Sequence, residues 1–129
     1  MDNQIEFYRN KLKYEIDSSD LFEALNNREN IIVIDTRKPL AYEKEHIPNA
    51  INFPHREMNP ETVKNLDRDV LYICYCDGIG CNASTKGALK LAEYSFKVKE
   101  LFGGIDWWKR DGYSTESTDS NGRKNTCEC

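Results

Sequence analysis

Residues 70–84 have the sequence Val-Leu-Tyr-Ile-Cys-Tyr-Cys-Asp-Gly-Ile-Gly-Cys-Asn-Ala-Ser. The part from Val70 to Cys76 is apolar, β-branched and aromatic and contains neither Pro nor Gly, which is typical of a buried strand. From Asn82 onward, apolar residues recur at helical spacing. This stretch therefore predicts a strand, a glycine-containing loop and a helix, in that order.

Strand and helix patterns alternate on both sides of this segment. Residues 31–34 form a near-continuous apolar run of the kind that is buried on both faces of a sheet. Shorter strands are predicted at 14–16, 50–53 and 98–101, and helices at 3–13, 18–25, 39–45, 60–66, 82–94 and 105–110. Five strands among helices predict an α/β fold: a central parallel sheet of about five strands with helices on both faces.

Length and composition fit one globular domain. The chain has 129 residues, of which 39% are hydrophobic and 31% charged. We expect an N-terminal helix over 1–13, a domain over 14–113, and a polar, flexible tail over 114–129, which has too few apolar residues to offset its ordering entropy. The net charge of −4 provides no basic face, so nucleic acid is not an expected partner.

The cysteines and the apolar stretches indicate the compartment. The chain has five cysteines, an odd number, and no apolar stretch near the length of a membrane span. Its first residues do not resemble a secretion signal. These features predict a cytoplasmic protein that contacts no membrane and whose thiols are reduced rather than joined in a disulfide scaffold. The oligomeric state is not predicted.

Cys76 is the candidate nucleophile. It ends the central strand, and sites in parallel sheets open at the carboxyl ends of strands. Loop amides and the N-terminus of the next helix favour a thiolate over a thiol. The predicted active-site loop continues through Asp77, Gly78, Ile79, Gly80, Asn82, Ala83 and Ser84. Gly78 and Gly80 are expected to adopt positive φ angles, and Asn82 or Ser84 to cap the helix.

The other cysteines have less decisive contexts. Cys74 alternates with Tyr75 in the strand and is expected to pack as a small hydrophobe. Cys81 is a resolving thiol, a second sulfur carrier or a plain loop residue. Cys127 and Cys129 lie in the polar tail, where solvation is favoured over binding a metal or shuttling sulfur. The spacing of cysteines and histidines does not match a zinc site, so we expect no metal and no cofactor.

Several motifs occur in one order along the chain. They are Ile34-Asp35-Thr36-Arg37, then Ala41-Tyr42-Glu43-Lys44-Glu45-His46-Ile47-Pro48-Asn49-Ala50-Ile51-Asn52-Phe53-Pro54, then the cysteine loop, then Leu101-Phe102-Gly103-Gly104-Ile105-Asp106-Trp107-Trp108. In this order they resemble a rhodanese homology domain over residues 14–113. The resemblance implies a sulfurtransferase whose loop cysteine, here Cys76, carries a sulfane sulfur as a persulfide. It passes this sulfur to a thiol or to cyanide.

Other matching residues are expected to support the architecture. Asp35 can accept hydrogen bonds from loop amides, and Arg37 can pair with Glu43 on the following helix. His46 suggests a cysteine–histidine pair, but the resemblance implies a structural role for it. Gly103 and Gly104 permit a tight turn. Trp107 and Trp108 are expected to divide between the core and a wall of the site.

The loop also departs from the pattern of the family. It is longer by one or two residues, has a second cysteine, and has no Arg or Lys between Cys76 and Ser84. A thiol or persulfide donor therefore fits better than thiosulfate. A related phosphatase or arsenate reductase would need an arginine at the end of the loop, and this chain has none.

Two classes of function follow. The first is a sulfurtransferase that takes sulfur from a small donor and passes it to an acceptor thiol, including one on a protein. The second is a non-catalytic or redox-sensing rhodanese-like binding module. Inactive relatives typically lack the loop cysteine, so the presence of Cys76 favours the enzyme.

Overall fold

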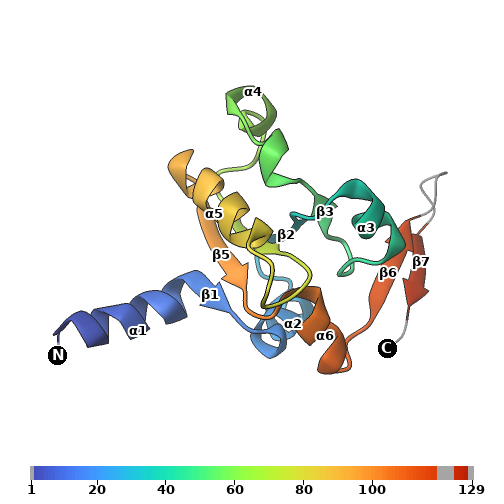
Figure 1. Ribbon diagram of the computed structural model, residues 1–129, viewed down its shortest axis with the longest axis horizontal. Coiled ribbons are helices and arrows are strands. Elements are labelled where there is room, and N and C mark those ends of the chain that lie inside the picture. Colours follow the sequence, from blue (N-terminus) through green and yellow to red (C-terminus); the bar gives the residue numbers. More distant parts are fainter. Residues whose placement is uncertain (1, 119–123, 128–129) are drawn as a thin grey trace.

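Five parallel strands form the centre of the protein in the order β1-β5-β4-β2-β3 (Figure 1). They are β1 (Glu15–Ile16), β2 (Ile31–Asp35), β3 (Ile51–Asn52), β4 (Leu71–Tyr75) and β5 (Lys97–Leu101). The computed structural model describes residues 2–118 and, for the backbone, 124–127. The predicted parallel sheet is confirmed.

The register of the two central strands places the site. Strand β4 pairs with β2 from Leu71 opposite Ile31 to Tyr75 opposite Asp35. Both strands therefore end at the same level, and the amide of Thr36 donates a 3.0 Å hydrogen bond to the carbonyl of Tyr75. Cys76 follows at once, at the carboxyl edge of the sheet.

Helices cover both faces of this sheet, as expected. They are α1 (Asp2–Tyr14), α2 (Ser18–Asn26), α3 (Pro39–Lys44), α4 (Pro60–Val63), α5 (Ala83–Glu93) and α6 (Gly104–Arg110), with a 3₁₀ turn η1 (His55–Glu57). Leu21 of α2 and Trp108 of α6 pack against Val33 and Ile73 on one face. The other core lies on the opposite face, where side chains of α4 and α5 pack against alternate strand residues such as Ile34 and Tyr72.

Local sequence accounts for the helix starts. Pro39 and Pro60 occupy first-turn positions, where the missing N–H costs nothing. Helix α2 is capped by Asp17, whose carboxylate accepts the amide of Asp20 at 2.8 Å, and not by a serine. Ser18 instead lies fully buried in the first turn.

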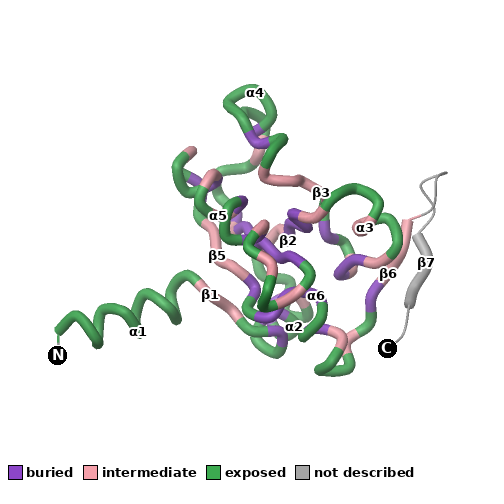
Figure 2. The backbone as a smooth tube through the Cα atoms, in the orientation of Figure 1, coloured by how far each residue is buried: buried purple, intermediate pink, exposed green. Residues whose placement is uncertain are grey.

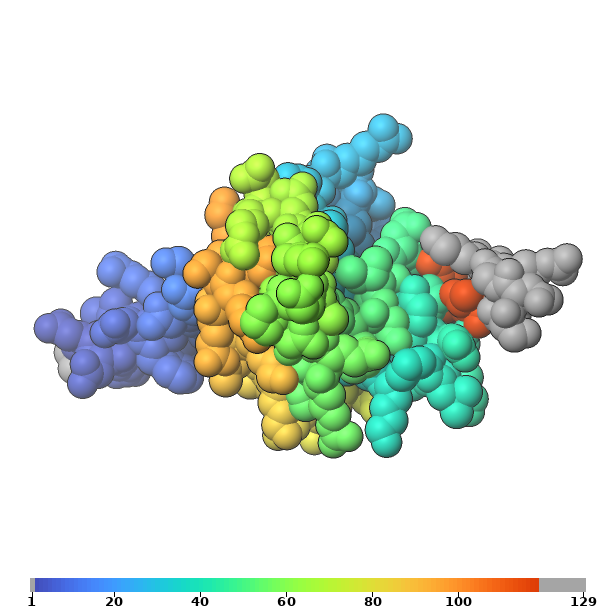
Figure 3. Space-filling view, turned by 90° about the horizontal axis from the view of Figure 1, so that it is seen from above, coloured from blue at the N-terminus to red at the C-terminus, as the bar shows by residue number. Residues whose placement is uncertain are grey.

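Helix α1 projects from one end of the molecule (Figures 1 and 3), and none of its residues is buried (Figure 2). Its apolar residues Ile5, Tyr8 and Leu12, which recur at helical spacing, are exposed. Across the described residues, every helix is too short or too polar to cross a lipid bilayer.

The first residues of the predicted tail form part of the folded body. Strand β6 (Thr115–Thr118) pairs antiparallel with β7 (Lys124–Cys127). Thr115 is fully buried, and its hydroxyl donates to Glu45 at 2.7 Å. These residues lie beyond the expected boundary at Tyr113, and they pack on the domain because a few polar side chains find buried partners despite the low apolar content. Cys127 contributes backbone to β7, and Cys129 lies outside the described residues.

Deleting residues 114–129 should lower the free energy of unfolding by about 2 kcal/mol or more, because buried polar groups would lose their partners. One such group is the ring of His46, which contacts Glu116. Urea unfolding of the chain ending at Tyr113 measures the loss. The chain ending at Thr118 is the control and should stay within about 1 kcal/mol of the full protein. Equal stability of all three chains would contradict this role of β6.

Candidate active site

Cys76 lies immediately after β4 and is only 2% exposed. Its carbonyl accepts a 3.0 Å hydrogen bond from the amide of Ile105, and the carbonyl of Asp77 accepts one of 2.8 Å from the amide of Asp106. Both donors are in the first turn of α6 and would otherwise lack partners inside that helix. The start of the loop is thus held by the N-terminus of a helix distant in sequence.

The close approach of α6 to the cysteine loop depends on glycines, but these are not Gly78 and Gly80, for which positive φ angles were expected. Gly103 and Gly104 have φ angles of 86° and 61°, whereas Gly78 and Gly80 are not among the glycines with positive φ. A Cβ built on Gly104 would lie 2.4 Å from the carbonyl oxygen of Cys76. The left-handed conformation is therefore in the facing turn before α6, and the cysteine loop itself uses ordinary angles.

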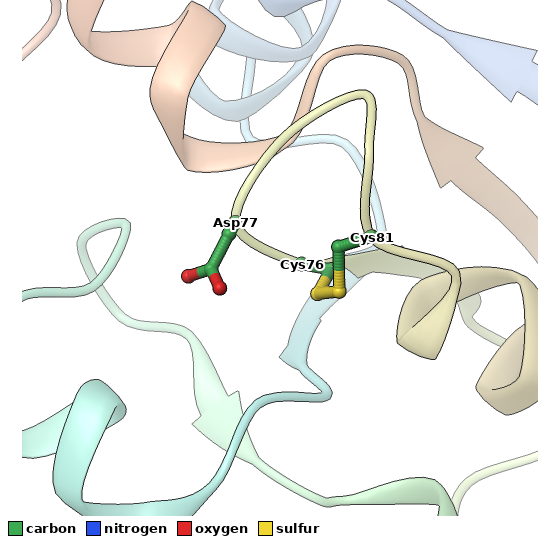
Figure 4. Close-up of side chains that lie close together, drawn as sticks. All are labelled: Cys76, Asp77 and Cys81. Carbon is green, nitrogen blue, oxygen red and sulfur yellow. A yellow bond between two sulfur atoms is a disulfide. The ribbon is translucent and has the colours of Figure 1, made fainter.

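Cys76 and Cys81 are joined by a disulfide, and their Cα atoms are 6.2 Å apart (Figure 4). This differs from the expectation of reduced thiols. The bond joins two residues of one short loop, so it holds together no elements that are far apart in sequence. Asp77 is the nearby carboxylate: its oxygen and the two sulfurs lie within 4.8 Å of one another. While the disulfide is present, neither sulfur is a thiolate that could bind a metal.

The rest of the loop leads into α5. Within the described chain, the amides of Gly78, Ile79 and Gly80 make no hydrogen bond, which leaves these donors for solvent or a bound anion. Asn82 occupies the N-cap position, but its side chain makes no capping bond. Ser84 is buried, and its hydroxyl donates to Glu100 at 2.7 Å instead.

A buried ionic network lies beside Cys76. The carboxylate of Asp35 accepts hydrogen bonds from the Arg37 guanidinium, at 2.7 Å from Nη2, and from the Tyr75 hydroxyl, also at 2.7 Å. Arg37 continues to Asp77 at 3.2 Å and to the carbonyl of Glu45. Burial opposes the charge of the guanidinium, but the hydrogen bonds and charge of Asp35 raise the pKa of Arg37 above its ordinary value.

The expected pairing of Arg37 with Glu43 is therefore wrong. Glu43 is exposed on α3, while Asp35, two residues before Arg37, makes the bidentate contact. The prediction that Asp35 accepts a loop amide is confirmed, because its Oδ1 accepts the amide of Arg37 at 2.9 Å. Burial and the charge of Asp35 also raise the pKa of the Tyr75 hydroxyl well above its ordinary value, so this group stays a neutral donor.

His46 anchors a loop and does not contact the cysteines. It is fully buried, stacks on Tyr42 and bonds through Nδ1 to the carbonyl of Tyr42 at 2.7 Å. Its Nε2 lies 3.2 Å from Glu116, and its backbone bridges to the same residue. These contacts agree with the structural role that was expected and supply no base for Cys76.

Basic residues reach the site from elements that precede the loop. A cavity of about 320 Å³ opens over the sulfurs of Cys76 and Cys81. Its wall includes Arg37 and Lys38 from the segment after β2, and His55 and Arg56 from η1. Lys38, His55 and Arg56 were missed because they are separated from Cys76 in sequence, whereas Arg37 was expected only as a supporting residue. They could have been found from the parallel topology, because the segments that follow neighbouring strands meet at the carboxyl edge of the sheet, where Cys76 lies.

The pKa of His55 reflects the burial of its imidazole and the positive charges that surround it. Burial lowers the pKa of its imidazole, and repulsion by Lys86, Lys90 and Arg56 lowers it further. The three cations come from two elements, α5 and η1. The lining of the cavity over Cys76 itself carries the cations Arg37, Lys38 and Arg56 against one carboxylate, Asp77, so it is electropositive although the net charge of the chain is negative.

A second cavity, of about 250 Å³, lies on the other side of the loop. It is lined by loop residues including Ile79 and Cys81, by Phe102, and by the carboxylates of Glu15 and Glu100. Cys81 lines both cavities, whereas Cys76 lines only the basic one.

The remaining residues singled out in the sequence lie in the core or on the surface. Cys74 is fully buried, and burial, with a contribution from Glu100, raises the pKa of its thiol, so it is an inert packing residue. Trp108 is in the core, as expected for one of the pair. Trp107 is 43% exposed beside Arg110 and does not line the cavity over the sulfurs.

The chain belongs to the rhodanese family: the sequence model of the rhodanese-like domain matches residues 18–111. This match covers strands β2 to β5 of the sheet and helices α2 to α6, and it stops before β6. The fold and the resemblance seen in the sequence are thereby confirmed.

Similar proteins include both enzymes and uncharacterised domains. The thiosulfate sulfurtransferase GlpE of Coxiella burnetii is 33% identical over 97 residues, which are 74% of this chain and 86% of that protein. An uncharacterised protein of Buchnera aphidicola is 33% identical over 99 residues, or 73% of this chain and 65% of its own length. The crystal structure of the BH2092 protein from Bacillus halodurans has a TM-score of 0.85 and 41% identity, covering 91% of this chain and 86% of that one.

Gly104→Ala should destabilise the protein and disturb the cysteine loop. The left-handed angle costs a non-glycine residue about 1–2 kcal/mol, and the added Cβ would also overlap the Cys76 carbonyl. Thermal unfolding measures the loss. Gly112 has a positive φ angle but open space around it, and Gly80 has neither a positive φ angle nor a close neighbour. The loss of stability on substitution by Ala should therefore be largest at Gly104, smaller at Gly112 and smallest at Gly80. A Gly104 variant as stable as the Gly112 variant would refute the steric part.

Proposed function

We propose that this protein is a sulfurtransferase that carries sulfane sulfur as a persulfide on Cys76. The observation that carries the proposal is the position of Cys76: at the carboxyl end of β4, under an electropositive cavity, on a loop fixed to the N-terminus of α6. Positive charge and a helix N-terminus both favour the thiolate. The relatives named as sulfurtransferases support the same class of reaction.

The reaction has two displacement steps. With the disulfide reduced, the thiolate of Cys76 attacks the sulfane sulfur of a donor, and the donor's leaving group departs with the bonding electrons. The Cys76 persulfide is then attacked at its outer sulfur by the thiolate of an acceptor, and Cys76 leaves as a thiolate. Sulfur moves from donor to acceptor with no net oxidation or reduction, so no cofactor is required.

The donor in this proposal is an anion. Lys38 and Arg56 carry positive charge at the wall of the cavity and are exposed. This removes the reason for preferring a thiol or persulfide donor to thiosulfate, which rested on the absence of basic residues within the loop alone. Thiosulfate and an anionic persulfide both meet the requirement of negative charge next to a sulfane sulfur.

Phosphoryl transfer is not supported by the same cavity. Of the two arginines that line it, Arg37 is already engaged by Asp35 and Asp77, and Arg56 belongs to η1 and not to the end of the cysteine loop. The loop therefore has no arginine of its own to bind the equatorial oxygens of a transferring phosphoryl group. We therefore do not propose a phosphatase.

Cys76→Ser should abolish persulfide formation and sulfur transfer, because an alkoxide is not available at neutral pH and cannot hold a sulfane sulfur. Intact-mass measurement of reduced protein after incubation with thiosulfate, or with a persulfide donor, detects the gain of one sulfur atom. Cys74→Ala is the matched control and should gain sulfur like the parent protein, since its thiol is buried. A sulfur adduct retained by the Cys76 variant would refute the proposal.

Lys38→Ala and Arg56→Ala should each raise KM for thiosulfate about twofold to fivefold with little change in kcat, as expected when an exposed charge that attracts the donor is removed. Added salt should shrink the difference from the parent protein. Arg9→Ala, on the projecting helix α1, removes the same kind of charge far from the cavity and should leave KM unchanged. Unchanged KM in both cavity variants would show that the basic wall does not bind the donor.

A further inference from the structure

We infer that Cys81 gives this site a second, reductive activity: it resolves the Cys76 persulfide and releases the sulfur as sulfide. The inference rests on the proposed function, because it starts from the persulfide. It adds a reaction in which no acceptor thiol takes the sulfur.

The surrounding structure accommodates the bond between the two cysteines. The Cα separation of 6.2 Å lies within the usual range for a disulfide, roughly 4.4–6.8 Å. With the bond in place, the carbonyls of Cys76 and Asp77 accept hydrogen bonds from α6, and α5 begins two residues after Cys81. Attack of one sulfur on the other therefore needs movement only within the loop.

The intervening residues are suited to such movement. Ile79 is 71% exposed, and a Cβ on Gly80 would meet nothing within 4 Å. The amide of Cys81 donates to the carbonyl of Gly78, at 3.2 Å, so the last part of the loop is a local turn with its own hydrogen bond. Cys81 can approach or leave Cys76 while both ends of the loop stay fixed.

The resolving step balances in atoms and electrons. The thiolate of Cys81 attacks the inner sulfur, Sγ of Cys76, and the bond between that atom and the outer sulfur breaks. The outer sulfur leaves with the electron pair as hydrosulfide and is reduced from the sulfane to the sulfide level. The two cysteines are oxidised to the disulfide seen in the structure.

Burial favours this internal attack over an external one. Cys76 is 2% exposed, so an outside thiol reaches it only through the basic cavity, whereas Cys81 is already held in the same loop. Tethering two reacting groups raises their effective concentration to the millimolar range or above. Internal resolution therefore competes with transfer unless the acceptor is abundant or docks well.

The disulfide must then be reduced before the next turnover, and the reductant in this scheme is a dithiol. Its first thiolate attacks the sulfur of Cys81, the more exposed partner and the only one that also lines the second cavity. Cys76 leaves as a thiolate under the basic residues. The second thiol of the reductant displaces Cys81, which returns both cysteines to the reduced state and leaves the reductant oxidised.

The experiment compares the full chain with Cys81→Ser, and Cys74→Ala serves as the control for the loss of a thiol. Each reduced protein is loaded with thiosulfate, freed of donor, and followed by intact mass, by sulfide release and by peptide mapping without reductant. The parent and the Cys74 variant should lose sulfur as about one sulfide per chain and gain the Cys76–Cys81 crosslink. The Cys81 variant should keep its persulfide at least tenfold longer.

Each result decides something different. Equal persulfide lifetimes without a crosslink would overturn the resolving role and leave the sulfurtransferase intact. No persulfide in any of the proteins, with either thiosulfate or a persulfide donor, would overturn the proposed function and this inference with it. For the reductive half, oxidised protein treated with limiting glutathione should give a mixed disulfide on Cys81. A mixed disulfide on Cys76 would refute the assigned direction of attack.

Discussion

The buried carboxylate of Asp35 holds together the edge of the sheet on which the site is built. It is fully buried and accepts hydrogen bonds from Arg37 and Tyr75, so it ties the end of β2 to the end of β4. The hydroxyl of Tyr75 in turn accepts the amide of Ile47, and Arg37 reaches forward to Asp77, the residue after the nucleophile. Removing one member of such a buried ion pair leaves an uncompensated charge and costs about 3–5 kcal/mol. The pair therefore restrains the start of the cysteine loop through the contact of Arg37 with Asp77. The first turn of α6 restrains the same part of the loop through its hydrogen bonds to the carbonyls of Cys76 and Asp77.

The order of strands and helices could be predicted because each element has its own pattern. The continuous apolar runs in β2 and β4 indicate burial on both faces, and two separate cores do lie on those faces. Prolines at 39 and 60 mark helix starts in the sequence itself. The contacts of residues 114–118 with the domain could not be predicted, because these residues are polar and composition alone does not show that Thr115 and Glu116 find partners on Glu45 and His46. Such contacts depend on the tertiary fold, which brings together residues about 70 positions apart.

The same limit applies to the candidate site. Cys76, the loop and the inert Cys74 follow from position along one strand, and the structure places them as that position implies. The partner of Arg37, the glycines with positive φ and the basic wall could not be found by reading the loop, because each depends on a segment from another part of the chain. Arg56 belongs to the turn after β3, and Gly104 is the first residue of α6, yet both lie at the carboxyl edge of β4. Physical reasoning from the parallel topology predicts that such segments meet there, but not which side chains point into the cavity.

The restraints on the site also separate its rigid part from its movable part. Asp35 and the first turn of α6 act on the start of the loop, at Cys76 and Asp77, whereas residues 78–80 have no such partner in the described chain. Cys81 lies at the boundary between this segment and α5. In the proposed cycle, a bond that opens and closes between Cys76 and Cys81 thus changes the exposed segment and leaves the sheet, both cores and the buried ion pair as they are. Cys76 is held by the core of the domain, whereas Cys81 follows a segment whose amides make no hydrogen bond in the described chain, and this difference is what the proposed change of redox state requires.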